Sequence, residues 1–266
     1  MCRFRAVATA LAAMISLLWL VAACSTRVDE AETAPDFAAD LAAGPSVALA
    51  PVTVAPAVGG VLAGADQADA DDALYAAFLA AAPGLEVWQE PTVRSLVGDE
   101  ELNALSDQYS RFGRLRPDQV RPLAAPLAGC RFLALARLLE EEVRTHAQNQ
   151  TASDPEARSE GLAEHGRPWT SIVSVEREVR VGLEIFELAS GESVWRSEAT
   201  SRHKQLYEYA EGMGDDPAQY IHQRIERANG PDHLSRGGEA LQLPDLVDLL
   251  RRAFTGLVDR LPVPGS

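Results

Sequence analysis

The pattern of side chains at residues 172–188 is the feature that most constrains how this chain can fold. Apolar residues alternate there with polar ones, and successive side chains of a strand point to opposite faces, so the pattern predicts a long strand with one face in water. The apolar positions are Val173, Val175, Val179, Val181, Leu183 and Ile185. Ser190 and Gly191 supply a turn, and Val194 and Trp195 mark a returning strand. The sequence therefore predicts a long antiparallel hairpin near residues 172–203.

Other strand and helix signals are spread over residues 45–262. The apolar run at residues 46–54 predicts a buried first strand, in which Pro51 marks an edge or a bulge. A helical stripe follows Pro244 and predicts a C-terminal amphipathic helix. Between them the pattern predicts a helix over 69–82, a short strand over 85–88, a helix from Asp99, a strand over 130–139 and a helix near 217–228.

The order of these elements indicates an α/β (α+β) fold with a single mixed β-sheet packed against helices. Nothing in the sequence indicates a second domain, so we expect residues 45–262 to form one domain. A polar insert at residues 140–169 interrupts it and contains both proline and glycine. A stretch of this length and composition predicts a loop or a hairpin tip, either functional or disordered.

The N-terminal segment has the parts of a bacterial export signal. Arg3 and Arg5 give a positive start, an apolar run follows, and small residues lead directly to Cys24. This ending resembles the lipobox of bacterial lipoproteins, which implies that residues 1–23 are a signal peptide and that Cys24 is lipidated. Two other interpretations remain: a single-pass anchor over residues 6–23, or a plain secretory signal before a coincidental cysteine. Recognition by the signal peptidase would involve Val21, Ala22 and Ala23.

The predicted mature chain is strongly acidic. Removal of Arg3 and Arg5 leaves 22 basic and 39 acidic residues, a formal charge of 22 − 39 = −17. This charge argues against nucleic acid as a partner and against electrostatic attachment to anionic lipid, so the acyl chains on Cys24 are expected to provide the anchor. Residues 24–44 are rich in alanine and acidic residues and predict a flexible tether from the lipidated cysteine. In enterobacterial lipoproteins an aspartate after the lipidated cysteine retains the protein in the inner membrane. The resemblance therefore implies that this chain, with Ser25 at that position, lies at the periplasmic face of the outer membrane, with the inner membrane as the alternative.

Three phrases resemble an envelope-protein family that contains the N-terminal domain of TolB together with CsgG, PelC and LpoB. The phrases are VALAPV at 47–52, LAGCRFLALARL at 127–138 and VGLEIFELASGESVW at 181–195. The resemblance covers residues 45–262 and departs from the family pattern at Glu187 and in the insert at 140–169. It implies non-enzymatic work: binding another envelope protein or building a secretion assembly. The sequence argues against a lipid-inserted hairpin like that of CsgG, because charged side chains that face lipid are costly. The predicted strand contains four of them, Glu176, Arg177, Glu178 and Arg180.

Motifs that carry chemistry are sparse in this sequence. The five histidines form no metal-binding motif, and no nucleophile elbow of the G-x-S-x-G type is present. Cys2 would be lost with the signal peptide and Cys24 would be lipidated, so Cys130 would be the only thiol left and no intrachain disulfide could form. Its place on an apolar strand predicts a core residue. We therefore predict no catalytic, metal or cofactor site, and no enzymatic activity.

Together these features predict a membrane-anchored, periplasm-facing lipoprotein that acts as a non-enzymatic accessory or assembly factor of the cell envelope. Its partners would be the lipid bilayer, through acylated Cys24, and another envelope protein or a second copy of itself. The alternative is a small-ligand-binding lipoprotein. The low aromatic content of 6% disfavours it, because ligand pockets usually contain several aromatic side chains.

Overall fold

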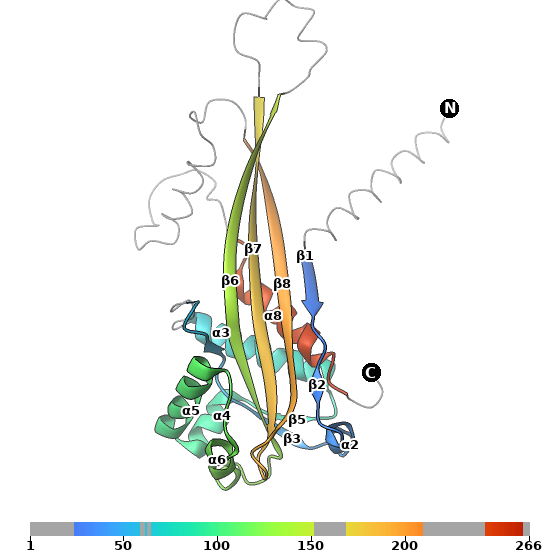
Figure 1. The fold of residues 1–266 in the computed structure, drawn as a ribbon, viewed down its shortest axis with the longest axis vertical. Coiled ribbons are helices and arrows are strands. Elements are labelled where there is room, and N and C mark those ends of the chain that lie inside the picture. Colours follow the sequence, from blue (N-terminus) through green and yellow to red (C-terminus); the bar gives the residue numbers. More distant parts are fainter. Residues whose placement is uncertain (1–23, 59–61, 63–64, 152–168, 210–242, 263–266) are drawn as a thin grey trace, which may run out of the picture. The chain divides into compact units, whose positions relative to one another are not determined.

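A computed structural model describes residues 24–58, 62, 65–151, 169–209 and 243–262 (Figure 1). The predicted signal peptide, residues 152–168 of the predicted insert and the predicted helix near 217–228 lie outside the described residues. The chain divides into two compact units, where the sequence analysis expected one domain. The larger unit, called the body below, contains residues 24–142, 178–202 and the segment from 246 onward. The second unit contains the described parts of 143–177 and 203–245.

One mixed sheet of eight strands forms the framework, which confirms the predicted fold class. Its strands follow the order β1-β8-β7-β6-β3-β5, while the short strands β2 and β4 pair with β8 and β6. The strands are β1 (Cys24–Val28), β2 (Glu32–Thr33), β3 (Ser46–Leu49), β4 (Thr53–Val54), β5 (Glu86–Trp88), β6 (Phe132–Thr151), β7 (Trp169–Glu187) and β8 (Ser193–Tyr209).

The predicted long hairpin is present as β7 and β8, and both strands extend beyond the predicted range of 172–203. Its turn requires a glycine at position 191. Gly191 has a φ of +73°, and a Cβ placed on it would lie 2.4 Å from the carbonyl oxygen of Pro117. Only a residue without a side chain fits both the left-handed backbone and this close approach. The turn is thereby fixed against the helical segment that contains Pro117.

The first part of the predicted polar insert is strand rather than loop. β6 continues through residues 140–151, beyond the predicted strand end at 139, and β7 already begins at Trp169. Charged side chains on β6 meet opposite charges on β7: Glu140 lies 2.6 Å from Arg180, and Arg144 lies 3.9 Å from Glu176. Strand pairing uses the backbone, so a polar run can continue a strand when its neighbour supplies opposite charges. The hydropathy pattern alone predicted the end of this strand too early, at residue 139.

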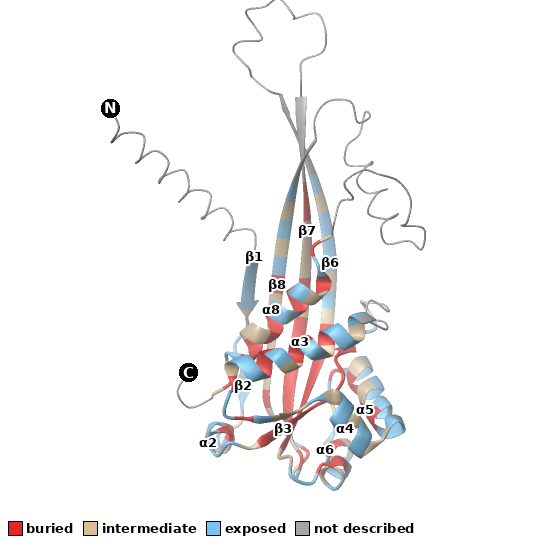
Figure 2. Ribbon diagram, turned by 180° about the vertical axis from the view of Figure 1, so that it is seen from behind, coloured by how far each residue is buried: buried red, intermediate tan, exposed pale blue. Residues whose placement is uncertain are grey.

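Helices cover both faces of the sheet in the body. On one face lie α2 (Phe37–Ala42), α3 (Ala65–Ala81) and α8 (Leu246–Val258), and Figure 2 shows buried residues where α3 and α8 cover the strands. The other face carries α4 (Glu90–Val97), α5 (Asp99–Phe112), α6 (Pro117–Val120) and the short 3-10 helix η1 (Arg121–Ala124). The C-terminal amphipathic helix is thus confirmed, and α3 begins four residues before the helix predicted from position 69.

Residues 24–44 are not the predicted tether. They form β1, β2 and α2, and their backbone pairs with β8, with Asp29 donating to the carbonyl of Glu198 (2.8 Å). Phe37 is only 1% exposed, and its ring meets the ring of Phe132 edge-on at 5.3 Å. Leu41, one helical turn later, is 2% exposed. This acidic segment is ordered by two buried apolar side chains at helical spacing and by backbone pairing with the edge of β8. The tether prediction is therefore wrong for these residues.

Candidate functional site

The connections from β3 and β5 leave the sheet on opposite faces. β3 pairs in parallel with β5 on one side and with β6 on the other. After β3 the chain passes to α3 on one face, whereas after β5 it passes to α4 and α5 on the other face. In parallel sheets this topological switch point, at the carboxyl ends of the strands, is where ligands usually bind. The candidate site therefore comprises the residues around these two strand ends.

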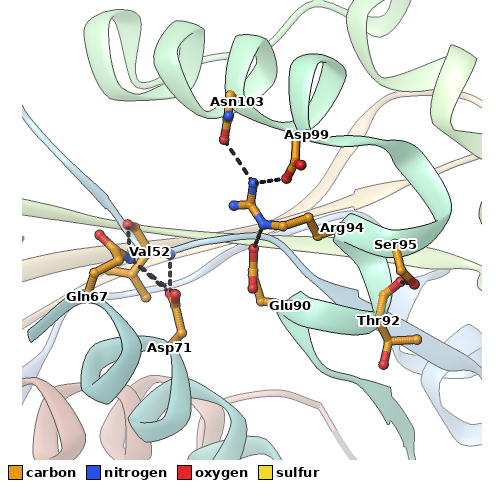
Figure 3. Close-up of polar contacts among 9 residues, drawn as sticks. All are labelled: Val52, Gln67, Asp71, Glu90, Thr92, Arg94, Ser95, Asp99 and Asn103. Carbon is orange, nitrogen blue, oxygen red and sulfur yellow. Dashed lines mark hydrogen bonds and ion pairs between the residues drawn. The ribbon is translucent and has the colours of Figure 1, made fainter. Parts of the chain in front are cut away.

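A closed polar network ties the segment after β3 to α3 (Figure 3). The backbone amide of Val52 donates to Asp71 Oδ1 (2.6 Å), and Gln67 Nε2 donates to the Val52 carbonyl (2.8 Å) and to Asp71 (3.1 Å). Burial raises the pKa of Asp71 to about 6, although the hydrogen bonds from Val52 and Gln67 oppose the shift. The negative charge of Glu90 raises this pKa further, and the positive charge of Arg94 lowers it. The network satisfies its own polar groups, so its role is to fix the loop after β3.

A second network joins α4 to the N-terminal part of α5 (Figure 3). The guanidinium of Arg94 donates to Glu90 Oε1 (2.5 Å), Asp99 Oδ1 (2.8 Å) and Asn103 Oδ1 (3.1 Å). The hydrogen bond to Asp99 raises the pKa of Arg94 most, with further support from Glu90. The two helices meet at Gly98, whose φ of +98° gives the corner between them. α4 is therefore held in a fixed position beside the end of β5.

Trp88, the last residue of β5, is fixed in place by its neighbours. Its indole Nε1 donates to Glu86 Oε1 (3.1 Å), and Glu86 Oε2 accepts from the Ser46 hydroxyl (2.7 Å). These hydrogen bonds, the one from Ser46 first, lower the pKa of Glu86 and keep it ionised. The indole ring lies against Gly129, where an added Cβ would stand 3.7 Å from it. Trp88 is thus a partly exposed aromatic side chain with little freedom to move.

A surface cavity of about 280 Å³ opens beside this tryptophan. We call it the β5 pocket; its lining residues are Tyr75, Val87, Trp88, Gln89, Thr92 and Leu96. Leu96 on α4 is 46% exposed, and Leu79, one turn after Tyr75 on α3, is 48% exposed. The lining contains no histidine, cysteine or carboxylate; its polar side chains are the phenol of Tyr75, the amide of Gln89 and the hydroxyl of Thr92, beside the indole of Trp88. Fixed aromatic and aliphatic side chains at a surface are typical of the centre of a protein interface.

The residues singled out by sequence do not meet at this site. Cys24 begins β1, at the other end of the strand order, and Val21, Ala22 and Ala23 lie outside the described residues. Cys130 lies just before β6 rather than on it and is half-buried. Burial, with a contribution from Glu86, raises the pKa of its thiol to about 12. A thiol of this kind is a poor nucleophile.

Sequence reasoning missed the side chains of the β5 pocket. Tyr75, Trp88 and Leu96 each belong to a short apolar pattern that also supplies core residues, so nothing in the sequence marks them as exposed. The one available signal is Leu79, which follows the buried Phe78 and lies off the buried stripe of α3. In the described part of the chain, no three His, Cys, Asp or Glu side chains are grouped as a metal site would need. Within the same residues, no helix has the length and hydropathy needed to cross a membrane.

Comparison with known proteins gives remote structural likenesses only. The sequence matches no protein-family model and no curated protein. The PelC dodecamer from Paraburkholderia phytofirmans is 13% identical with a TM-score of 0.38, over 90% of this chain and 99% of that chain. The hypothetical protein CT253 from Chlamydia trachomatis is 15% identical with a TM-score of 0.36, over 82% and 95%. Lipoprotein GNA1162 from Neisseria meningitidis is 10% identical with a TM-score of 0.28, over 69% and 96%. At these scores the likenesses assign neither a family nor a function.

Proposed function

We propose that this protein is a lipid-anchored, periplasm-facing envelope protein that docks another envelope protein through the β5 pocket. It would act as a non-enzymatic accessory or assembly factor. The observation that carries the docking role is the pocket itself: Tyr75, Trp88 and Leu96 present apolar surface to solvent on a rigid support. Interfaces are enriched in such aromatic anchors because their burial gains much apolar area at little entropic cost.

The open edge of β5 offers a second element of recognition. β5 ends the strand order, and no other described strand pairs with its outer side. An extended segment of a partner can hydrogen-bond to such an edge while one of its side chains enters an adjacent pocket. β5 has only three residues, which is short enough to avoid unspecific pairing. Edge and pocket together fit an apolar, extended segment of a protein partner.

The anchor and the docking site lie at opposite ends of the sheet. Cys24, which follows the lipobox-like segment, is the first residue of β1, and β1 and β5 are the two ends of the strand order. Five interstrand spacings separate them, roughly 24 Å in all. Because β1 pairs with β8, acyl chains on Cys24 would be attached directly to the folded body. In this arrangement the β5 pocket stays free for a partner while the lipid holds the other edge.

The pocket supports docking better than binding of a small polar ligand. At about 280 Å³ it lies near the lower limit of ligand cavities, and no charged side chain lines it. The lining therefore has no charged group that could orient a small ionic ligand, whereas an apolar side chain carried by a protein partner needs no such group.

Photo-cross-linking in cells tests the docking role. A photoreactive phenylalanine analogue at position 96 is expected to give a discrete adduct with an envelope protein, and Trp88→Ala should abolish that adduct. The matched control places the analogue at Phe112, which is 72% exposed on α5 and lies outside the pocket. The docking role is wrong if position 96 gives no protein adduct, or the same adducts as position 112.

Metabolic labelling with a palmitate analogue tests the anchor. Cys24→Ala should abolish both labelling and processing of the precursor, whereas Cys130→Ala should leave both unchanged. A Cys24→Ala protein that is still processed and fractionates with membranes as the parent does would contradict lipidation at this position.

A further inference from the structure

A second and larger cavity lies in the body, at the turn end of the β7–β8 hairpin. We call it the β2 pocket; it has a volume of about 540 Å³ and is lined by β2, the start of β8, Glu184 of β7 and the segment after α5. The pairing of β2 with β8 holds one wall in place, with Glu32 opposite Arg196 and Thr33 opposite Trp195. This wall belongs to the segment that the sequence predicts to be a tether. The cavity shares no residue with the β5 pocket.

Glu184 is an unusual lining residue because it is a buried acid. Its side chain belongs to a residue only 4% exposed, and no described group donates a hydrogen bond to its Oε2 atom. Burial raises the pKa of this carboxyl, while Ser193, Arg196, Tyr109 and Arg114 act in the opposite direction. A buried carboxylate without full hydrogen bonding is costly, and such groups in a folded protein often mark a binding site.

A second lining residue also has an unpartnered polar atom. Trp195 is 1% exposed, and its indole Nε1, which can only donate, meets no acceptor among the described residues. The side chain of Trp195, however, packs with Leu183 and Ile185 in the core beneath α3 and α8, on the face of the sheet opposite Glu184. The unused polar atom on the cavity side is therefore Oε2 of Glu184, and a buried carboxylate oxygen without a partner in a cavity wall is better explained by a polar ligand than by a purely structural role.

The charges around the cavity have both signs. Arg114 and Arg196 supply guanidinium groups, whereas Glu32 and Glu184 supply carboxyl groups. Guanidinium groups recognise carboxylates through paired hydrogen bonds, and a carboxylate recognises an ammonium group in the same charge-assisted way. A purely anionic or purely cationic molecule would meet repulsion from one of the two sets. A ligand with both charges meets attraction from each.

We propose that the β2 pocket binds a small zwitterion, a free amino acid or a dipeptide, with its carboxylate on Arg114 and Arg196 and its ammonium group on Glu184. The volume of the cavity is within the range of small-molecule sites. This ligand-binding function is additional to docking at the β5 pocket, and neither depends on the other.

Calorimetry and thermal unfolding of the mature chain with Cys24→Ser, which removes the acylation site, test the proposal. The probes are the free amino acids and L-alanyl-L-alanine, the latter also with its amine acetylated and with its carboxyl amidated. Binding and a raised unfolding midpoint are expected for a free zwitterion, with neither blocked derivative binding. Glu184→Gln and Arg196→Met should each weaken binding by roughly ten-fold or more, because each removes a charge-assisted hydrogen bond.

Two controls separate loss of the site from loss of the fold. Arg252→Met removes the same charge from an exposed position on α8 and should leave binding unchanged. Glu184→Gln relieves a buried charge, so the unliganded variant should unfold at the same midpoint as the parent or a higher one. The proposal is overturned if none of the probes binds, if blocked and free dipeptides bind equally, or if Arg252→Met weakens binding as much as Arg196→Met.

Discussion

The two ends of the sheet are held in place by different interactions. At one end, β5 joins a parallel pair of apolar strands, and its surroundings are fixed by side chains: the Asp71 and Arg94 networks and the held indole of Trp88. At the other end, β1 and β2 join the long antiparallel strands mainly through backbone hydrogen bonds, with few apolar side chains of their own. The apolar strands at the β5 end were predicted from the sequence, whereas the pairing of β1 and β2, which depends on backbone hydrogen bonds, was not.

The largest expected effect concerns the anchored end. If residues 24–44 are part of the body, Phe37→Ala should lower the free energy of unfolding by about 3–5 kcal/mol, because it removes a buried ring. Phe112→Ala, the matched change at a ring that is 72% exposed, should have almost no effect. Urea denaturation of the mature chain measures both. Equal and small effects would mean that the segment is a tether after all.

A second prediction concerns the pH dependence of the β5 end. The pKa of Asp71 is raised from 3.8 to about 6, so the folded state binds its proton more tightly than the unfolded state. Ionisation of Asp71 therefore lowers the free energy of unfolding as the pH rises from about 4 to above 6, by up to about 3 kcal/mol. Asp71→Asn should remove this component, so the variant should gain stability relative to the parent as the pH rises from about 4 to about 7.

Urea denaturation of the parent and of Asp71→Asn across this range supplies the measurement. The difference between their free energies of unfolding should change in the stated direction as the pH rises. A difference that stays constant with pH would show that Asp71 is not buried as described, and that the loop after β3 is held in another way.

The smallest effect is expected for the link between α4 and α5. Arg94→Met should lower the free energy of unfolding by roughly 1 kcal/mol, because the guanidinium is partly exposed and water screens its ion pairs. Arg111→Met is the control: Arg111 is 69% exposed and stands 3.9 Å from Asp107, so its loss should be near neutral. Identical values for the two variants would indicate that the Arg94 network does not hold α4 beside the β5 pocket.

Strong side-chain periodicity marked three of the predicted elements that the structure confirms: the β7–β8 hairpin, the helix from Asp99 and the C-terminal helix. The continuation of β6 past residue 139 and the pairing of residues 24–33 were not marked in this way, because their order comes from ion pairs and backbone contacts with distant strands. A single sequence contains no direct record of such contacts.

The candidate sites were harder to predict than the fold. The β5 pocket consists of apolar residues that a sequence cannot distinguish from core residues. The β2 pocket forms only because the fold brings β2 close to Glu184. The alternating pattern of β7 predicted only that the side chain of Glu184 faces water. Lipidation at Cys24 remains a prediction from the lipobox-like segment alone. Docking and ligand binding, in contrast, come from side chains that only the structure brings together.

One cross-linking experiment in cells compares the two ends directly. The photoreactive analogue is placed either at Arg27, which is 86% exposed on β1, or at Leu96 in the β5 pocket. If β1 is held at the membrane while β5 docks a partner, position 27 should label phospholipid and position 96 should label a discrete envelope protein. Protein adducts at position 27 together with lipid adducts at position 96 would contradict the account.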